Sequence, residues 1–167
     1  FAKDRLDLGT RFLLEHLPKH VGNAKLICDM CCGSGILASI LAMQNPQAKI
    51  WAIDESFLAC QSAKETAEIN QIFSVTSLCS HAFETCQENN FDLIVCNPPF
   101  HQGSSEGLHV AMTIFEQAYQ KLSKGGEFWI VANQHLGYLN SLKKIFDHVE
   151  IVAKNSMFQI IKSQKKS

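Results

Sequence analysis

The hydrophobic positions of the chain fall into two patterns that alternate along most of its length. Short, nearly continuous apolar runs are separated by longer segments in which apolar side chains recur every three or four residues. The short runs predict buried strands, and the longer segments predict helices with one buried face. Strands are expected at residues 25–30, 49–53, 73–78, 92–97, 127–132, 149–153 and 158–161. Helices are expected at residues 12–17, 36–44, 56–70, 109–122 and 139–146.

The order of these elements predicts the fold class. Strand and helix alternate from residue 25 to residue 146, which is typical of α/β proteins whose helices cover both faces of a parallel sheet. The connection at Asn155 and Ser156 between the last two strands is too short for a helical crossover, so this pair must be antiparallel. We therefore expect an α/β fold with a doubly wound, seven-stranded, mostly parallel sheet and an antiparallel edge strand. Thr10 is the expected N-cap of the first helix.

The composition predicts a single domain. With 167 residues, 46% of them apolar, the chain can bury a substantial core, and we expect residues 1–167 to form one domain whose first 20 residues are an N-terminal helix or lid. No apolar run is long enough to span a bilayer.

The seven cysteines are odd in number and lie mostly in apolar segments, which favours reduced thiols and a cytoplasmic location. Cys28, Cys31 and Cys32 lack a second pair of ligands at zinc-binding spacing, so we expect no metal site.

Positive charge is concentrated in the last third of the chain. The net charge is −1, which argues against a surface that is strongly basic overall. Residues 121–167 nevertheless hold eight lysines against Glu127, Asp147 and Glu150. Two interpretations stay open: a face that follows the phosphates of a nucleic acid, or a solvated surface with a frayed lysine-rich tail.

The strand expected at residues 92–97 ends in residues that can do chemistry. Pro98 and Pro99 cannot continue a sheet ladder, so the strand must end at Asn97, at the edge where parallel sheets bind ligands. The Asn97 side-chain oxygen and the Pro98 carbonyl can each accept a hydrogen bond from a planar NH2 group, which directs its lone pair toward an electrophile. Phe100 offers a flat face on which a base or an amide can stack. The alternative is a turn that merely ends the strand.

A glycine turn follows the first strand of the alternating region. The spacing Gly33-x-Gly35-x-x-Ala38 between a strand and a helix fits a dinucleotide-binding turn, and Asp54, at the end of the next strand, is placed to bind a ribose diol. A nicotinamide coenzyme and S-adenosylmethionine both fit this arrangement. Asp29 favours the second, because a carboxylate there can bind the ammonium group of S-adenosylmethionine and has no role toward a nicotinamide coenzyme. Its alternative role is to cap the loop.

These motifs together resemble a known family. Segments 29–35, 54–56 and 97–102 are similar to the class I S-adenosylmethionine-dependent methyltransferases, and among them to the ribosomal RNA guanine-N2 methyltransferases. Segments 6–11 and 126–138 are similar to two further segments of that subgroup, the large-subunit (23S) enzyme slightly more than the small-subunit (16S) one. The resemblance covers nearly the whole chain and implies a Rossmann-like methyltransferase fold. In that family a second methyltransferase-like domain precedes the catalytic one, so we expect an N-terminal domain to be missing from this chain.

The resemblance also implies a reaction and a set of site residues. The reaction is transfer of a methyl group from S-adenosyl-L-methionine to the exocyclic N2 amine of a guanine in ribosomal RNA. The RNA is either naked or part of an assembling subunit. The expected protein is a cytoplasmic monomer that needs no metal and no membrane. The residues implied in catalysis are Asn97, Pro98 and Phe100. Those implied in cofactor binding are Asp29, Cys32, Gly33, Gly35, Asp54, Ser80, His81 and Asn97. Those implied in substrate binding are Phe100, His101, Asn133, His135 and Tyr138.

Two positions depart from the family pattern. Cys31 stands where the family has glycine, so the turn there either avoids a positive φ or is strained. Ser80 or His81 occupies the position of an Asp or Asn that faces the adenine amine, which implies a weaker contact or one made by the backbone. Two other interpretations stay open. One is methylation of a protein glutamine or of adenine by the same Asn97 chemistry, and the other is a non-catalytic RNA-binding module on a methyltransferase fold.

Overall fold

Strands and helices alternate in the computed structural model, which describes residues 6–19, 21–98 and 104–166. The helices are α1 (Leu8–His16), α2 (Ile36–Gln44), α3 (Phe57–Ile69), α4 (Ser105–Lys121) and α5 (Tyr138–Lys143). The strands are β1 (Leu26–Met30), β2 (Lys49–Asp54), β3 (Val75–Cys79), β4 (Phe91–Cys96), β5 (Leu122–Asn133), β6 (His148–Lys154) and β7 (Phe158–Gln164). Within these ranges no helix is both long and apolar enough to cross a membrane.

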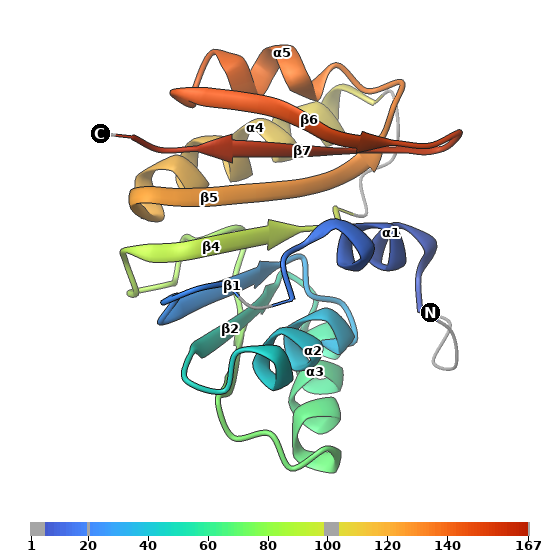
Figure 1. Cartoon of the computed structure of the whole chain (residues 1–167). Coiled ribbons are helices and arrows are strands. Elements are labelled where there is room, and N and C mark those ends of the chain that lie inside the picture. Colours follow the sequence, from blue (N-terminus) through green and yellow to red (C-terminus); the bar gives the residue numbers. More distant parts are fainter. Residues whose placement is uncertain (1–5, 20, 99–103, 167) are drawn as a thin grey trace.

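The strands form a seven-stranded sheet in the order β3-β2-β1-β4-β5-β7-β6 (Figure 1). The first five strands in this order are parallel, whereas β7 is antiparallel to both of its neighbours. The predicted α/β fold is confirmed, but the antiparallel strand does not lie at the edge. β6 forms that edge, because its hairpin partner β7 inserts beside β5 and pairs with the hydrogen-bonding groups that β5 would otherwise leave open.

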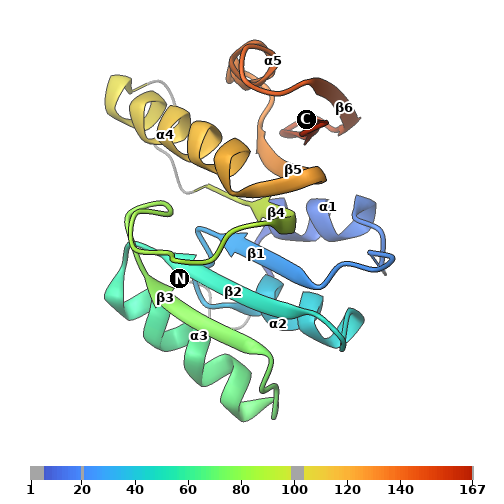
Figure 2. The ribbon, with the colours of Figure 1, turned by 90° about the vertical axis from the view of Figure 1, so that its left-hand side faces the viewer.

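Helices cover both faces of the sheet (Figure 2). On one face Phe12 of α1, Leu41 of α2 and Ala63 of α3 belong to a buried cluster with the strands. On the other face the buried cluster includes Phe115 of α4 and Leu142 of α5. Because successive strand residues point to opposite faces, the central strands are apolar throughout, and this is why they appear in the sequence as continuous apolar runs.

Two helices begin earlier than their apolar periodicity suggests. The N-cap of α1 is Asp7 rather than Thr10, and its carboxylate accepts a hydrogen bond from the Thr10 N–H at 3.0 Å. The start of α4 lies one turn before His109, where the Ser104 hydroxyl accepts a hydrogen bond from the Gly107 N–H at 3.0 Å. In both cases a polar cap decides the start, and the apolar positions on which the expectation rested begin only one turn later.

The carboxyl ends of β1, β2 and β4 meet at one edge of the sheet. Helix α2 follows β1 on one face and α4 follows β4 on the other, and β1 and β4 are neighbours (Figure 2). The chain therefore changes face between these two strands, and ligands of open α/β sheets bind in the crevice at such a point. Helix α1 lies at the same edge, beside the end of β4 (Figure 1), and its Phe12 ring contacts the Phe158 ring of β7.

Candidate active site

The turn between β1 and α2 has positive φ angles at three positions. They are +63° at Cys31, +53° at Gly33 and +79° at Gly35. Glycine adopts this conformation readily, whereas a residue with a Cβ is strained in it. Gly35 also allows close packing, because a Cβ there would lie 2.6 Å from Cα of Ala63 in α3. The turn therefore needs glycine at Gly35 for two independent reasons.

Cys31 and Cys32 lie within this turn but in different surroundings. Cys31 has the strained backbone, which was one of the two predicted possibilities. Its thiol hydrogen-bonds with that of Cys96 at the end of β4, and this contact together with burial raises the pKa of Cys31. Cys32 is buried, which also raises its pKa, and its N–H donates to the Ile53 carbonyl at 3.0 Å. Both thiols are therefore protonated at neutral pH and are poor nucleophiles.

Asp54 ends β2 with its carboxylate fixed by two backbone groups. Its Oδ2 accepts a hydrogen bond from the Gly33 N–H at 3.0 Å, and its Oδ1 accepts one from the Ser56 N–H at 2.9 Å. Each carboxylate oxygen can accept a further hydrogen bond, so both oxygens keep a lone pair for a ligand. This arrangement joins the glycine turn to the end of β2, and it fits the predicted binding of a ribose diol.

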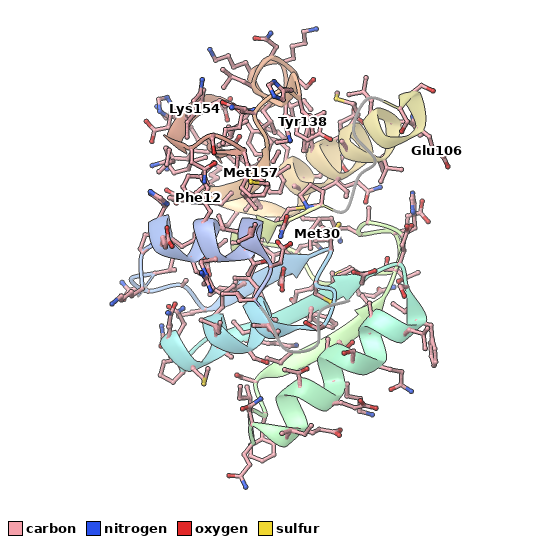
Figure 3. The ribbon with its side chains drawn as sticks, turned by 90° about the vertical axis from the view of Figure 1, so that its right-hand side faces the viewer. Phe12, Met30, Glu106, Tyr138, Lys154 and Met157 are labelled. Atoms are coloured by element: carbon pink, nitrogen blue, oxygen red, sulfur yellow. The ribbon has the colours of Figure 1, made fainter. Side chains whose placement is uncertain are left out.

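A pocket of about 360 Å³ opens beside Asp54. Met30, at the end of β1, and Glu106, in the first turn of α4, both line it. Both residues are labelled in Figure 3. Ser80 and His81, the residues predicted to lie near an adenine ring, are also part of the lining. The volume falls within the range of small-molecule sites, and the pocket lies at the edge where the fold predicts a ligand.

The polar groups of Ser80 and His81 already have partners within the protein. The Ser80 hydroxyl accepts a hydrogen bond from the Thr85 N–H at 3.1 Å, and the His81 ring lies 3.2 Å from the Glu55 carboxylate. Neither side chain is a carboxylate or an amide that could replace the expected Asp or Asn. The predicted weak or backbone-mediated contact at this position is consistent with these surroundings.

Asp29 lies beneath the glycine turn and is 1% exposed. A hydrogen bond from the Ala38 backbone of α2 favours its charged form, but burial dominates and raises the pKa of Asp29 to about 8. Its Oδ2 has no hydrogen-bond partner among the described residues. The Asp29 side chain therefore contacts the first turn of α2. Oδ2 can still accept a hydrogen bond from a cationic group or a water molecule.

Asn97 follows β4 directly and is held by the N-terminal segment. Its Nδ2 donates hydrogen bonds to Asp7 Oδ2 at 2.7 Å and to the Thr10 hydroxyl at 2.9 Å. Gly9 leaves room for this contact, since a Cβ there would come within 3.2 Å of Asn97 Oδ1. Both amide hydrogens are thus occupied inside the protein, and the amide oxygen is the atom left to accept a hydrogen bond from a ligand.

The remaining residues of the motif are only partly described. Pro98 is half-buried and follows Asn97 at the end of β4. Phe100 and His101, predicted to stack against and contact the substrate, lie outside the described residues. Their roles stay predictions.

The segment after β5 separates the three residues that were predicted to contact the substrate. Asn133 is half-buried and its Oδ1 accepts a hydrogen bond from the N–H of His135, which is itself exposed. Tyr138 is 3% exposed, with its ring 5.3 Å from that of Phe115, and burial raises the pKa of Tyr138 to about 12. Tyr138 therefore has a packing role in this structure, whereas His135 is accessible at the site edge.

One contact at the candidate site is missing from the sequence-based prediction. Asp7 and Thr10 hold the Asn97 amide, yet they precede it by 90 and 87 residues, and no local periodicity links the two segments. The only signal in the sequence was the resemblance of residues 6–11 to a family segment, with no role attached to it. Thr10 was the expected N-cap of α1, whereas Asp7 caps this helix and also accepts a hydrogen bond from Asn97.

The chain is similar in sequence to known methyltransferases. The family model for the methyltransferase small domain matches residues 1–162. The ribosomal RNA large subunit methyltransferase G of Pseudomonas putida (strain W619) is 42% identical over 167 residues, which are 99% of this chain and 44% of that protein. The protein of the same name from Pseudomonas aeruginosa (strain PAO1) is also 42% identical over 99% of this chain and 44% of its own length. The chain thus spans less than half the length of these curated relatives.

Solved structures show the same fold. The 16S rRNA N2 methyltransferase RsmC of T. thermophilus, in complex with AdoMet and guanosine, superposes with a TM-score of 0.87 at 26% identity, over 99% of this chain and 45% of that one. A ribosomal protein L11 methylase from Lactobacillus delbrueckii subsp. bulgaricus has a TM-score of 0.75 at 19% identity, over 95% of this chain and 77% of that one. This second likeness shows the fold alone. From the match to the family model over nearly its whole length, the chain belongs to the methyltransferase small domain family.

Proposed function

We propose that this chain binds S-adenosyl-L-methionine in the pocket beside Asp54 and directs its methyl group to the exocyclic N2 amine of a guanine in ribosomal RNA. The observation that carries the proposal is the fixed Asn97 amide, which presents an acceptor oxygen at the carboxyl end of β4. A nucleobase amine needs such an acceptor when its lone pair is to be directed at an electrophile. The relatives named ribosomal RNA methyltransferases support ribosomal RNA as the substrate class, and RsmC in complex with guanosine supports guanine.

The chain's own groups fit the cofactor. Asp54 offers two fixed carboxylate oxygens with lone pairs for the ribose hydroxyls, and the pocket between β2 and α4 offers apolar walls for an adenine ring. The unpartnered Oδ2 of Asp29 fits a cationic group near the glycine turn, directly or through water. When bound, S-adenosyl-L-methionine supplies an electrophilic methyl group on a sulfonium. No described residue needs to act as a nucleophile toward it.

The protein contributes orientation more than proton transfer. Asn97 Oδ1 and the Pro98 carbonyl accept the two hydrogens of the amine, and this fixes its plane and localises its lone pair. Positioning of this kind lowers the barrier because the reactants no longer have to find their geometry by collision. The amine becomes acidic only as its nitrogen gains the methyl group, so its proton can leave to solvent without a strong base. Phe100 is the expected stacking partner of the base.

The first test is ligand binding. S-adenosyl-L-methionine should raise the melting temperature of the protein and NAD should not, because a ligand at a hundredfold excess over its Kd stabilises by about 2.7 kcal/mol. Asp54→Ala should remove most of the shift. A shift with NAD and none with S-adenosyl-L-methionine would contradict the proposal.

The second test is the reaction itself. The protein is incubated with labelled S-adenosyl-L-methionine and ribosomal RNA from cells that lack it, and the modified nucleoside is identified by mass spectrometry. N2-methylguanosine is the expected product. Asn97→Ala should lower the single-turnover rate by orders of magnitude and leave cofactor affinity nearly unchanged. Asn89→Ala, at an exposed position before β4, is the matched control and should be neutral. Methyl incorporation into protein or adenine would redirect the proposal, and a near-normal rate for Asn97→Ala would refute the assignment of this residue.

A further inference from the structure

The Asn97 side chain is oriented by a carboxylate from a distant part of the chain. Asp7 Oδ2 accepts the Asn97 Nδ2–H at 2.7 Å, and the same oxygen accepts the Thr10 N–H at 3.0 Å. A distance of 2.7 Å between an N–H donor and a carboxylate is typical of a charge-assisted hydrogen bond. Asp7 thus makes two contacts, one that caps α1 and one that reaches the candidate active site.

This contact decides which end of the amide faces the ligand. A primary amide can be turned by 180° with little change in shape, so packing alone does not distinguish its oxygen from its nitrogen. The Thr10 hydroxyl can donate or accept and therefore accommodates either orientation. The Asp7 carboxylate can only accept. Turning the amide over would place its oxygen against that carboxylate at hydrogen-bonding distance, which is electrostatically unfavourable.

Helix α1 fixes the position of Asp7. The helix is anchored on the sheet by buried Phe12, Leu13 and Leu17, and it lies beside the end of β4 (Figure 1). Gly9 keeps the space between the helix start and the amide clear, since a Cβ there would come within 3.1 Å of Asp7 Oδ2 and 3.2 Å of Asn97 Oδ1. The capping geometry that starts α1 is thereby the same geometry that holds the amide.

We propose that Asp7 is a positioning residue for methyl transfer. Its carboxylate fixes the Asn97 amide with the oxygen toward the substrate amine and polarises that oxygen into a stronger acceptor. The inference rests on the proposed function of Asn97. It adds that an N-terminal residue which does not touch the substrate sets the rate through Asn97.

The test separates this role from helix capping. Asp7→Ser keeps a good N-cap but loses the charged acceptor. Asp7→Asn keeps the N-cap and the size of the side chain and replaces the charged acceptor with a neutral one. We expect the single-turnover rate to fall about ten- to a hundredfold for Asp7→Ser, which corresponds to the loss of one hydrogen bond to a charged group. The rate should fall less for Asp7→Asn. Cofactor affinity should stay within about twofold and the melting temperature close to that of the wild type. Glu15→Gln removes one exposed carboxylate from the same helix and should change none of these values.

A double-mutant cycle gives the decisive result. In Asn97→Asp the introduced carboxylate faces Asp7, and adding Asp7→Asn should restore a hydrogen bond between the two positions. Asp7→Asn is therefore expected to lower the rate when Asn97 is present and to raise it in the Asn97→Asp background. If Asp7 acted only as a helix cap, Asp7→Asn would change the rate in the same direction whether Asn97 or Asn97→Asp is present. Equal effects in the two backgrounds would therefore overturn the inference. An active wild type with unaffected Asp7 variants overturns this inference only, whereas a wild type that forms no N2-methylguanosine overturns the proposed function and the inference with it.

Discussion

Cys31 has a left-handed backbone conformation, with φ of +63°, at a position where the family resemblance implies glycine. This conformation costs a residue with a Cβ about 1 to 2 kcal/mol. Cys31→Gly removes the strain but adds chain entropy to the unfolded state, a loss of about 0.5 to 1 kcal/mol, and it also removes the thiol contact with Cys96. We expect stability within about 1 kcal/mol of the wild type and cofactor affinity that is equal or tighter, as measured by urea denaturation and calorimetric titration.

The matched control for this change is Cys79→Gly. Cys79 lies in β3 without a positive φ, so glycine there can only destabilise. If Cys31→Gly instead weakens cofactor binding tenfold or more, the Cys31 side chain is itself a contributor to the site, and strain is the wrong account of this position.

Asp29 makes the stability of the protein depend on pH. Burial raises its pKa from 3.8 to about 8. Between these two values the folded protein holds a proton that the unfolded chain has lost, so stability falls as pH rises, by about 1.4 kcal/mol per pH unit for one group. The Asp29→Asn variant should not show this pH-dependent loss of stability. It should therefore become progressively more stable than the wild type from about pH 4 to about pH 8. Denaturant unfolding across this range measures the difference.

A parallel pH dependence of wild type and Asp29→Asn would show that Asp29 is ionised in the folded protein. Bound S-adenosyl-L-methionine acts in the opposite direction if its ammonium lies near Asp29, because it favours the carboxylate. Cofactor binding below pH 8 should then release a proton, which titrations in buffers of different ionisation enthalpy detect.

At the residue scale, the sequence indicated candidate site residues where residue type and strand position were sufficient. Asn97 and Asp54 could be proposed as site residues because each lies at the carboxyl end of an apolar run that forms a strand. The contact of Asp7 with Asn97 could not, because it joins segments 90 residues apart and depends on how α1 docks on the sheet. The N-cap of α1 was placed one turn late because Asp7 and Thr10 are both good capping residues and the apolar pattern begins only at Phe12.

At the element scale, α3 packs closely against the turn that begins α2. A Cβ on Gly35 would lie 2.6 Å from Ala63 Cα and 2.7 Å from Ala63 Cβ, and φ at Gly35 is +79°. Gly35→Ala therefore combines backbone strain of about 1 to 2 kcal/mol with overpacking of about 1 to 3 kcal/mol. We expect the free energy of unfolding to drop by roughly 2 to 5 kcal/mol, together with weaker cofactor binding because the turn is displaced.

Gly125 provides the control for this prediction. Its φ is +81° and a Cβ there would meet nothing within 4 Å, so Gly125→Ala reports the backbone strain alone. The difference between the two variants is the packing contribution, measured by denaturant unfolding. Equal losses would mean that α3 moves aside without cost and that the contact with Ala63 does not restrain the turn.

The order of elements was more predictable than their arrangement in the sheet. Alternating apolar runs specify strands and helices, and a short connection specifies an antiparallel hairpin, so seven strands and one antiparallel pair followed from local patterns. The position of β7 between β5 and β6 did not. Either strand of the hairpin could have paired with β5, and long-range pairing with residues 127–133 decides between them.

At the scale of the whole molecule, the lysines of the last third do not form one uniform basic face. Lys121 Nζ donates to the carbonyls of Cys86 and Glu88 at 2.7 and 2.9 Å, and Lys162 pairs with Glu150 at 2.9 Å. These two amino groups already have partners within the protein and are less available for phosphates. Lysines 124, 143, 144, 154 and 166 are exposed. For these exposed lysines, both a phosphate-binding face and a solvated surface stay open.

Lys154 is an exposed lysine on the same edge of the sheet as the candidate active site. It ends β6, opposite Gln159 of β7, and Gln159 in turn pairs with Ala132 near the end of β5. Lys154 therefore lies at the carboxyl edge of the sheet, on the side of the hairpin that carries Met157 (Figure 3). Lys124 lies near the opposite end of β5, away from the candidate active site.

If the substrate is RNA, this placement predicts a salt-dependent contribution from Lys154. Each phosphate contact with a single strand contributes about 0.7 to the slope of log affinity against log salt concentration. Lys154→Gln should lower RNA affinity at low salt and reduce that slope by about this amount, with little change in cofactor binding or in stability. Lys124→Gln carries the same charge change at the far edge and should leave the slope as it is. Filter binding at several salt concentrations measures both variants. A slope that neither variant changes would place the RNA on another face, and an affinity independent of salt would favour a substrate without phosphates, such as a protein.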